Sequence, residues 1–201
     1  MFQQKIILPK RGDVTAKEVW LDEKIIEKLN KRYIAFDVET TGLNAHSDRI
    51  IEVGAVLFEN GQPTQKFGSL VHSVTEVPYS VTVINLITTD MVRAAPSERT
   101  VYDKLSAFLG DALNGETLIC AYNARFDMSF LSETFERLGY DAKITYVDTL
   151  AFARYVIRCL KSYRQSAVAS YLNIDNEQEH RADSDAKVCG MILSELLSIQ
   201  N

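Results

Sequence analysis

The chain of 201 residues is long enough for one folded domain with its own core, and 46% apolar and 24% charged residues are typical of a globular protein. No apolar run approaches the length of a membrane span, and a net charge of −5 argues against a protein that coats long stretches of nucleic acid. Its three cysteines (Cys120, Cys159 and Cys189) lie in apolar contexts without CxxC spacing, which is typical of reduced thiols. We therefore expect a cytoplasmic protein that does not bind a membrane.

The first 31 residues differ in pattern from the rest, and we expect an N-terminal extension (residues 1–31) before a main domain (residues 32–201). Apolar positions at helical spacing predict a helix over Thr15–Asn30. The simpler interpretation is a helix that packs on the main domain. The alternative is a docking helix for a partner, with Trp20 as its anchor.

Strand patterns follow the extension. The predicted strands run over Tyr33–Val38, Ile50–Glu59 and Gln62–His72. The pair Asn60-Gly61 predicts a tight hairpin turn, which makes the second and third strands antiparallel. The next segment, Ser80–Ala95, is irregular and predicts short helical turns.

Strands and helices alternate in the second half of the chain. Short strands are predicted over Thr117–Tyr122 and Ile144–Val147. Helices are predicted over Ser97–Leu113, Arg125–Leu138, from Asp148 or Thr149 to about Arg158, Gln165–Leu172 and Ala182–Ser198. Together these elements predict an α/β fold, a mixed five-stranded sheet flanked by helices, with the first strand at its centre.

The segment Phe36–Gly42 carries two carboxylates at the end of that first strand. Strand side chains alternate between faces, so Asp37 and Glu39 point the same way. Two crowded, dehydrated carboxylates repel each other, and a divalent cation is the usual compensation because hard cations prefer oxygen ligands. Gly42 ends the strand and allows the backbone to approach a ligand closely.

Three further residues supply candidate ligands or bases. Asp127 falls in the first turn of a helix that follows a strand, where ligand sites of α/β sheets are found. Asp185 falls in the first turns of the last helix, and His180 precedes it in a loop. Taken alone, Asp127 is a residue that stabilises its helix dipole, and His180 is a solvated surface residue. Taken together, the acids predict a metal centre with a histidine able to accept a proton near neutral pH.

Three segments, Phe36–Gly42, Asn123–Asp127 and His180–Asp185, resemble the three motifs of the DEDDh-type, DnaQ-like 3′–5′ exonucleases, which include the proofreading exonuclease of bacterial DNA polymerase III. The resemblance covers roughly residues 32–199 in the same order, and it implies a ribonuclease H-like exonuclease fold. Because position 181 is arginine and not tyrosine, the histidine subclass is favoured.

The resemblance also implies roles for individual residues. Two divalent cations, Mg²⁺ or Mn²⁺, would bind to Asp37, Glu39, Asp127 and Asp185. Catalytic roles fall to Glu39 and to His180 as the general base. The substrate, the 3′ end of single-stranded DNA, would contact Thr40, Thr41, Gly42, Leu43 and Asn123, and nucleoside 5′-monophosphates would be released.

Two departures from the family pattern concern the substrate. Tyr122 stands where the family usually has histidine, and the family's threonine-glycine pair is replaced within the segment Ile84–Thr88. The first alternative is an exoribonuclease or oligoribonucleotide-degrading enzyme of the same fold, and the second is a binding module with an inactive site, although no acid is missing. Proofreading or repair is the expected role, and residues 1–31 are the expected contact to a polymerase or replisome partner.

Overall fold

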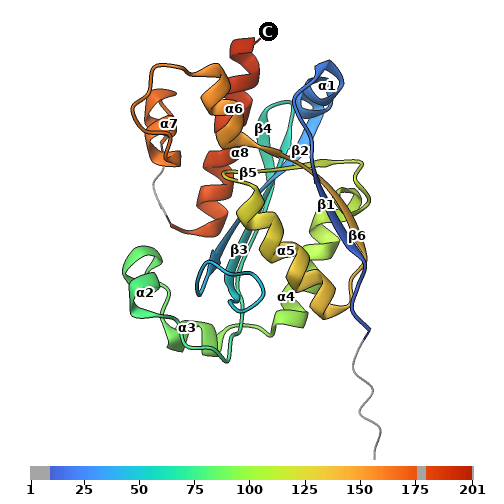
Figure 1. Ribbon diagram of the computed structural model, residues 1–201, viewed down its shortest axis with the longest axis vertical. Helices are drawn as coiled ribbons and strands as arrows, with labels where there is room; N and C mark the ends of the chain where they lie inside the picture. The colour runs from blue at the N-terminus through green and yellow to red at the C-terminus, as the bar shows by residue number, and fades with distance from the viewer. Residues whose placement is uncertain (1–9, 176–179, 201) are drawn as a thin grey trace, which may run out of the picture.

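Six strands form one mixed sheet in this computed structural model, which describes residues 10–175 and 180–200 (Figure 1). They are β1 (Val14–Glu18), β2 (Arg32–Thr40), β3 (Ile50–Glu59), β4 (Gln62–Leu70), β5 (Leu118–Ala121) and β6 (Ala142–Asp148). The order across the sheet is β1-β6-β5-β2-β3-β4. Strand β2 pairs with β3 in antiparallel and with β5 in parallel orientation, so it lies inside the sheet, as predicted.

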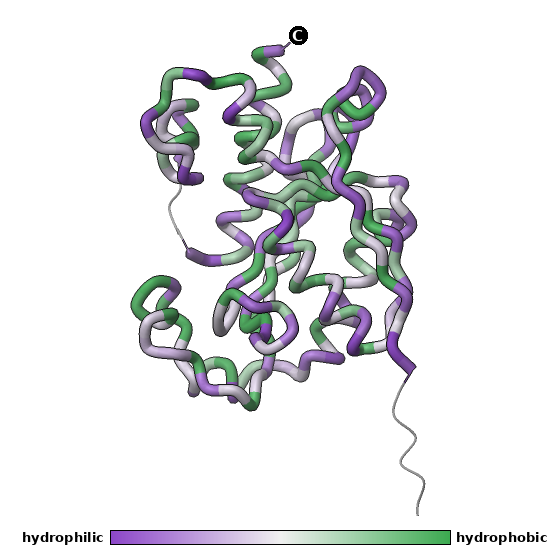
Figure 2. Tube along the Cα trace, in the orientation of Figure 1, coloured by the Kyte–Doolittle hydropathy of each residue, from purple (hydrophilic) through white to green (hydrophobic). Residues whose placement is uncertain are grey.

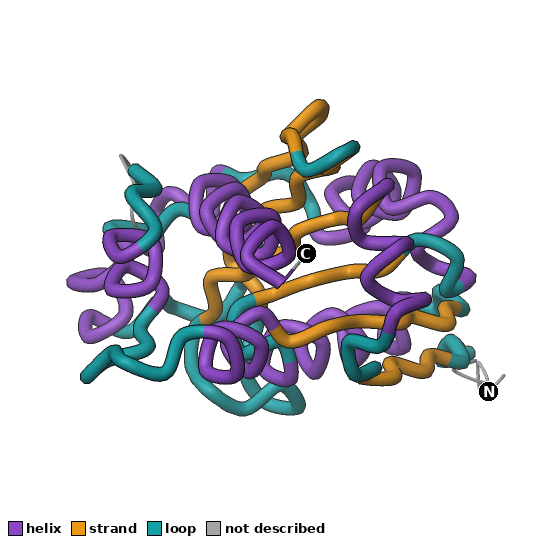
Figure 3. The backbone as a smooth tube through the Cα atoms, turned by 90° about the horizontal axis from the view of Figure 1, so that it is seen from above, coloured by secondary structure: helices purple, strands orange, loops and turns teal. Residues whose placement is uncertain are grey.

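Helices cover both faces of the sheet, as the view along it shows (Figure 3). They are α1 (Glu23–Lys31), α2 (Tyr79–Asn85), α3 (Thr89–Ala94), α4 (Glu98–Leu109), α5 (Arg125–Leu138), α6 (Thr149–Val156), α7 (Gln165–Tyr171) and α8 (Ala182–Gln200), with a 3-10 turn at Gly110–Asn114. None of these helices is both long and apolar enough to cross a membrane.

The alternation of side chains along β2 divides the core in two. Ile34 and Phe36 pack with α4 and α5 on one face. Tyr33 and Ala35 pack with α6, α7 and α8 on the other face. The same period of two directs Asp37 and Glu39 to the α8 face. Figure 2 shows apolar residues gathered along the inner strands and α8.

The predicted count of five strands and the single helix over Thr15–Asn30 are wrong. Val14–Glu18 forms β1, which pairs in parallel with β6 at the edge of the sheet. Nearly all of its side chains are exposed, so its sequence lacks the apolar alternation of a half-buried strand. The helix starts only after Asp22, whose side chain accepts a hydrogen bond from the Ile25 N–H (2.9 Å).

The extension therefore contributes an edge strand to the sheet as well as a helix. Trp20 lies between the two elements and is largely exposed. Its ring packs edge-to-face on that of Tyr155, with the ring centroids 6.0 Å apart. The domain boundary after residue 31 and a partner contact through residues 1–31 stay predictions. The first nine residues of the extension are outside the described ranges.

Candidate active site

The carboxyl end of β2 meets the first turns of α5 and α8 at one place. Asp37 and Glu39 come from β2, Asp127 from the first turn of α5, and Asp185 from the first turn of α8. All four line one cleft of about 850 Å³, together with His180. The structure thus brings together every residue predicted to bind metal and the predicted base.

Helix α8 reaches this place because a glycine on β3 makes room for it. A Cβ atom added to Gly54 would lie 2.1 Å from the main-chain carbon of Ala182, the first residue of α8. Only glycine allows this approach, which brings the start of α8 directly onto the sheet. Asp185 is carried toward the end of β2 as a result.

A buried carboxylate that the sequence analysis missed anchors the start of α8. Glu52 on β3 is 4% exposed and lies directly opposite Glu39 in the antiparallel register. It accepts hydrogen bonds from the Arg181 guanidinium and from the Ala182 N–H (3.1 Å). This ion pair compensates a further negative charge on the face that carries the acids and ties α8 to β3. The sequence did contain a signal for this residue, because Glu52 is the one charged residue in the otherwise apolar run Ile50–Phe58.

Burial and mutual repulsion dominate the electrostatics of the two innermost acids. Burial raises the pKa of Asp37 well above its usual range, and the neighbouring Asp127 and Asp185 raise it further. Burial likewise raises the pKa of Asp127, which is 2% exposed, although its Oδ1 accepts a hydrogen bond from the Val38 N–H (3.2 Å). Repulsion of this kind is relieved when a cation binds between the carboxylates.

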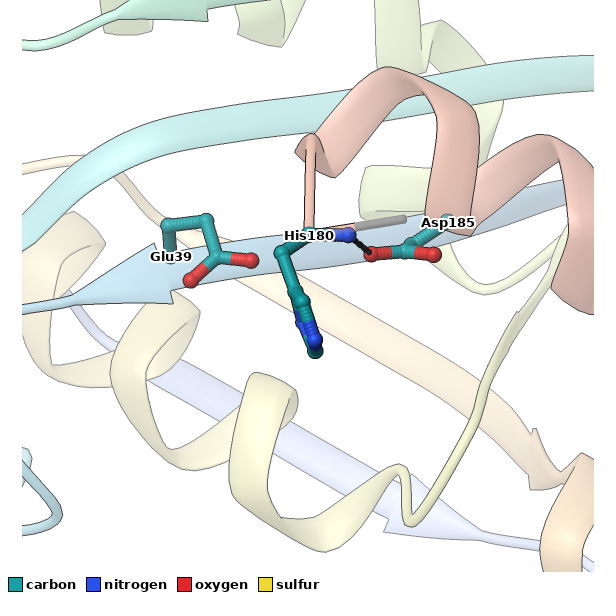
Figure 4. A group of neighbouring side chains, drawn as sticks. All are labelled: Glu39, His180 and Asp185. Atoms are coloured by element: carbon teal, nitrogen blue, oxygen red, sulfur yellow. Dashed lines mark hydrogen bonds between the residues drawn. The ribbon is translucent and has the colours of Figure 1, made fainter. Parts of the chain in front are cut away.

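Glu39, His180 and Asp185 come together from β2, the loop before α8 and α8 itself (Figure 4). One potential ligand atom from each lies within 4.8 Å of the other two. The His180 N–H donates to Asp185 Oδ2 (2.8 Å), and the Asp185 main-chain oxygen accepts from Gln165 Nε2 (2.8 Å). Burial raises the pKa of Glu39 to about 7. The carboxylates of Glu39 and Asp185 are oxygen donors of the kind that hard divalent cations such as Mg²⁺ or Mn²⁺ prefer.

His180 itself is held by backbone geometry. Its φ of +65° is in the left-handed region, which is uncommon for residues other than glycine. The hydrogen bond from its N–H to Asp185 fixes the loop in this conformation, while the imidazole stays exposed at the cleft. The ring is therefore accessible to water and to a ligand.

The predicted substrate-binding residues lie at and beyond the end of β2. Thr40 donates a hydrogen bond from its hydroxyl to the Gly42 oxygen (2.6 Å), and Leu43 is 87% exposed. Thr41 is buried, and its N–H donates to the Arg49 oxygen (2.9 Å). Among the predicted substrate contacts, Asn123 lines the cleft, with a left-handed backbone (φ +66°). Their roles toward substrate stay predictions.

Tyr122, which replaces the family's usual histidine, stabilises part of the cleft lining through a hydrogen bond. Its hydroxyl donates to the main-chain oxygen of Tyr163 (2.6 Å), across 41 residues, so it anchors the segment before α7. That segment places Arg164 at the cleft, and α6 adds Arg154. Local sequence patterns gave no signal for Arg154, because only the tertiary fold brings it to the cleft.

Three comparisons with known proteins agree with this geometry. The family model described as "Exonuclease" (RNase_T) matches residues 34–193. DNA polymerase III PolC-type of Clostridium perfringens is 35% identical over 167 residues, which are 83% of this chain and 11% of the polymerase. The corresponding protein of Pediococcus pentosaceus is 38% identical over 162 residues (79% and 11%). The chain therefore spans about a tenth of the length of these relatives.

Solved structures show the same fold. Escherichia coli Exonuclease I in complex with a dA16 oligonucleotide matches with a TM-score of 0.73 at 18% identity, over 85% of this chain and 41% of that one. Exonuclease X in complex with 5′ overhanging duplex DNA matches with a TM-score of 0.64 at 22% identity, over 83% and 90%. These likenesses confirm the α/β exonuclease fold, and the family match confirms the resemblance found in the motifs. The chain belongs to the exonuclease family.

Proposed function

We propose that this protein is a cytoplasmic, metal-dependent 3′–5′ exonuclease that removes nucleoside 5′-monophosphates from DNA. The observation that carries the proposal is the meeting of Asp37, Glu39, Asp127 and Asp185 with His180 in one cleft. Two divalent cations held by the four carboxylates would neutralise phosphate charge and activate water. The strand end with Thr40–Leu43 would seat the terminal nucleotide beside them.

The residues of the chain divide the reaction between them. His180 accepts a proton from the attacking water at an imidazole nitrogen while the water oxygen bonds to phosphorus. The bond from phosphorus to the 3′ oxygen breaks, and the 3′ oxygen takes a proton from solvent water. The shortened strand then leaves with a 3′ hydroxyl, and the nucleoside 5′-monophosphate is released.

Two arginines of the cleft suit the backbone of the same strand. Arg154 and Arg164 both line the cleft. The Arg154 guanidinium lies 5.9 Å from the ring centroid of Tyr163. These two cationic side chains would hold phosphates upstream of the scissile bond.

DNA is the favoured substrate because the relatives at 35–38% identity are DNA polymerases and the two structural neighbours described above were solved with DNA. Proofreading or repair is the proposed role, beside a polymerase or replisome partner that residues 1–31 contact. RNA, the alternative raised by the sequence, is an arm of the experiment below.

The test is digestion of 5′-labelled single-stranded, paired, mismatched and RNA oligonucleotides with Mg²⁺. We expect ladders that shorten from the 3′ end, fastest on unpaired DNA, with no products when EDTA is present. The variant Asp185→Asn should produce no ladder under the same conditions. Release from the 5′ end, internal cleavage, or digestion that continues in EDTA would contradict the proposal.

A further inference from the structure

Asn85, the last residue of α2, makes a buried contact with the acid centre. Its side chain is 2% exposed, and Nδ2 donates a hydrogen bond to Glu39 Oε2 (2.9 Å). The other end of the amide, Oδ1, accepts from the Ile87 N–H (3.0 Å). Both ends are therefore bound, so the amide has one orientation and cannot rotate away from Glu39.

The turn after α2 is held independently of Glu39. Leu86 has a φ of +59°, a strained conformation for leucine, and its N–H donates to the Thr82 oxygen (2.9 Å). The Thr82 hydroxyl donates to the Ile87 oxygen (2.8 Å). These bonds close the turn through α2 itself and leave the Asn85 amide directed at the end of β2.

The contact restrains one oxygen of Glu39 and leaves the other available. Oε2 is occupied by Asn85, whereas no described residue donates a hydrogen bond to Oε1. A carboxylate oxygen of Asp185 lies within 4.8 Å of one of Glu39, and like charges repel, so an unrestrained Glu39 side chain would gain by turning away. A neutral amide restrains it without adding a positive charge that would compete with a cation.

We propose that Asn85 is a positioning residue that holds the Glu39 carboxylate with one oxygen free for the divalent cation. The proposal rests on the proposed metal-dependent function, and its first readout is metal binding without DNA. Hydrogen bonds behind metal ligands typically contribute 10–100-fold to affinity, so loss of this donor should weaken cation binding about tenfold.

The experiment measures Mn²⁺ binding by isothermal titration to the full chain without DNA. Asn85→Leu keeps the volume of the side chain and removes the donor, and Asn85→Ser keeps a polar group that is too short to reach Glu39. Thr82→Val is the matched control, because it disturbs the same turn through the Thr82–Ile87 bond and leaves the Glu39 contact in place.

Both Asn85 variants should bind Mn²⁺ about tenfold more weakly and need more Mg²⁺ for half-maximal nuclease activity, while Thr82→Val binds as the wild type does. In a Glu39→Gln background, Asn85→Ser should have no additional effect on Mn²⁺ binding. Wild-type affinity in the Asn85 variants, or an equal loss in Thr82→Val, would overturn the positioning role. Mn²⁺ binding that follows this pattern in a protein without nuclease activity would support the positioning role and reject the proposed function.

Discussion

The raised pKa of Glu39 predicts that the metal-free protein loses stability as the pH rises. The ordinary value is 4.5, and burial raises it to about 7, so the folded state binds the Glu39 proton more tightly than the unfolded chain does. The resulting stabilisation is complete below pH 4.5 and is lost as the pH rises through 7. The difference between the two pKa values corresponds to about 3 kcal/mol of folding free energy. Asp37 and Asp127 act in the same direction because their pKa values are also raised.

The measurement is urea unfolding in EDTA at pH 5 and at pH 8, for the wild type and for Glu39→Gln. The wild type should be less stable at pH 8, and most of the contribution of about 3 kcal/mol from Glu39 should be absent from the variant. Mg²⁺ should restore stability to the wild type at pH 8, because bound cations favour the ionised carboxylates of the folded state. A wild type that becomes more stable from pH 5 to pH 8, or equal pH dependence in both proteins, would refute this reasoning.

Three further changes test the base, the cleft wall and the packing of α8. His180→Ala should reduce turnover about 10²–10⁴-fold in single-turnover digestion and leave Mn²⁺ binding nearly intact; a loss of binding would identify His180 as a ligand. Arg154→Ala should raise KM for single-stranded DNA and leave hydrolysis of the p-nitrophenyl ester of thymidine 5′-monophosphate unchanged. The control Arg158→Ala, which lies outside the cleft, should change neither the KM nor this hydrolysis. Gly54→Ala should lower the free energy of unfolding by about 1–3 kcal/mol or more, measured in urea, because its Cβ overlaps Ala182; wild-type stability would contradict the close approach.

Local patterns in the sequence located the acids because each acid is at a recognisable position. Asp37 and Glu39 follow the period of two along a buried strand, and Asp127 and Asp185 are in the first turns of helices. The order of strand and helix along the chain also predicted their meeting at one edge of the sheet. Family resemblance supplied the role of His180, which a loop position alone could not indicate.

Contacts between distant segments could not be predicted in this way. Glu52 meets Arg181 across 129 residues, and Asn85 meets Glu39 across 46 residues. No local periodicity records such pairings, since they depend on where the sheet, α2 and α8 meet in space. Strand β1 escaped prediction for a different reason: an exposed edge strand has no buried face and so leaves no alternating pattern.

The edge position of β1 matters for how this domain would be trimmed. The family match begins at residue 34, and all of the acids come after it. A protein cut to that boundary would keep its motifs and lose β1, which leaves the backbone amides and carbonyls of β6 along Ala142–Tyr146 without their partner strand. An uncovered parallel edge of this kind recruits other chains, so the shortened domain would tend to aggregate even though its chemical groups are complete.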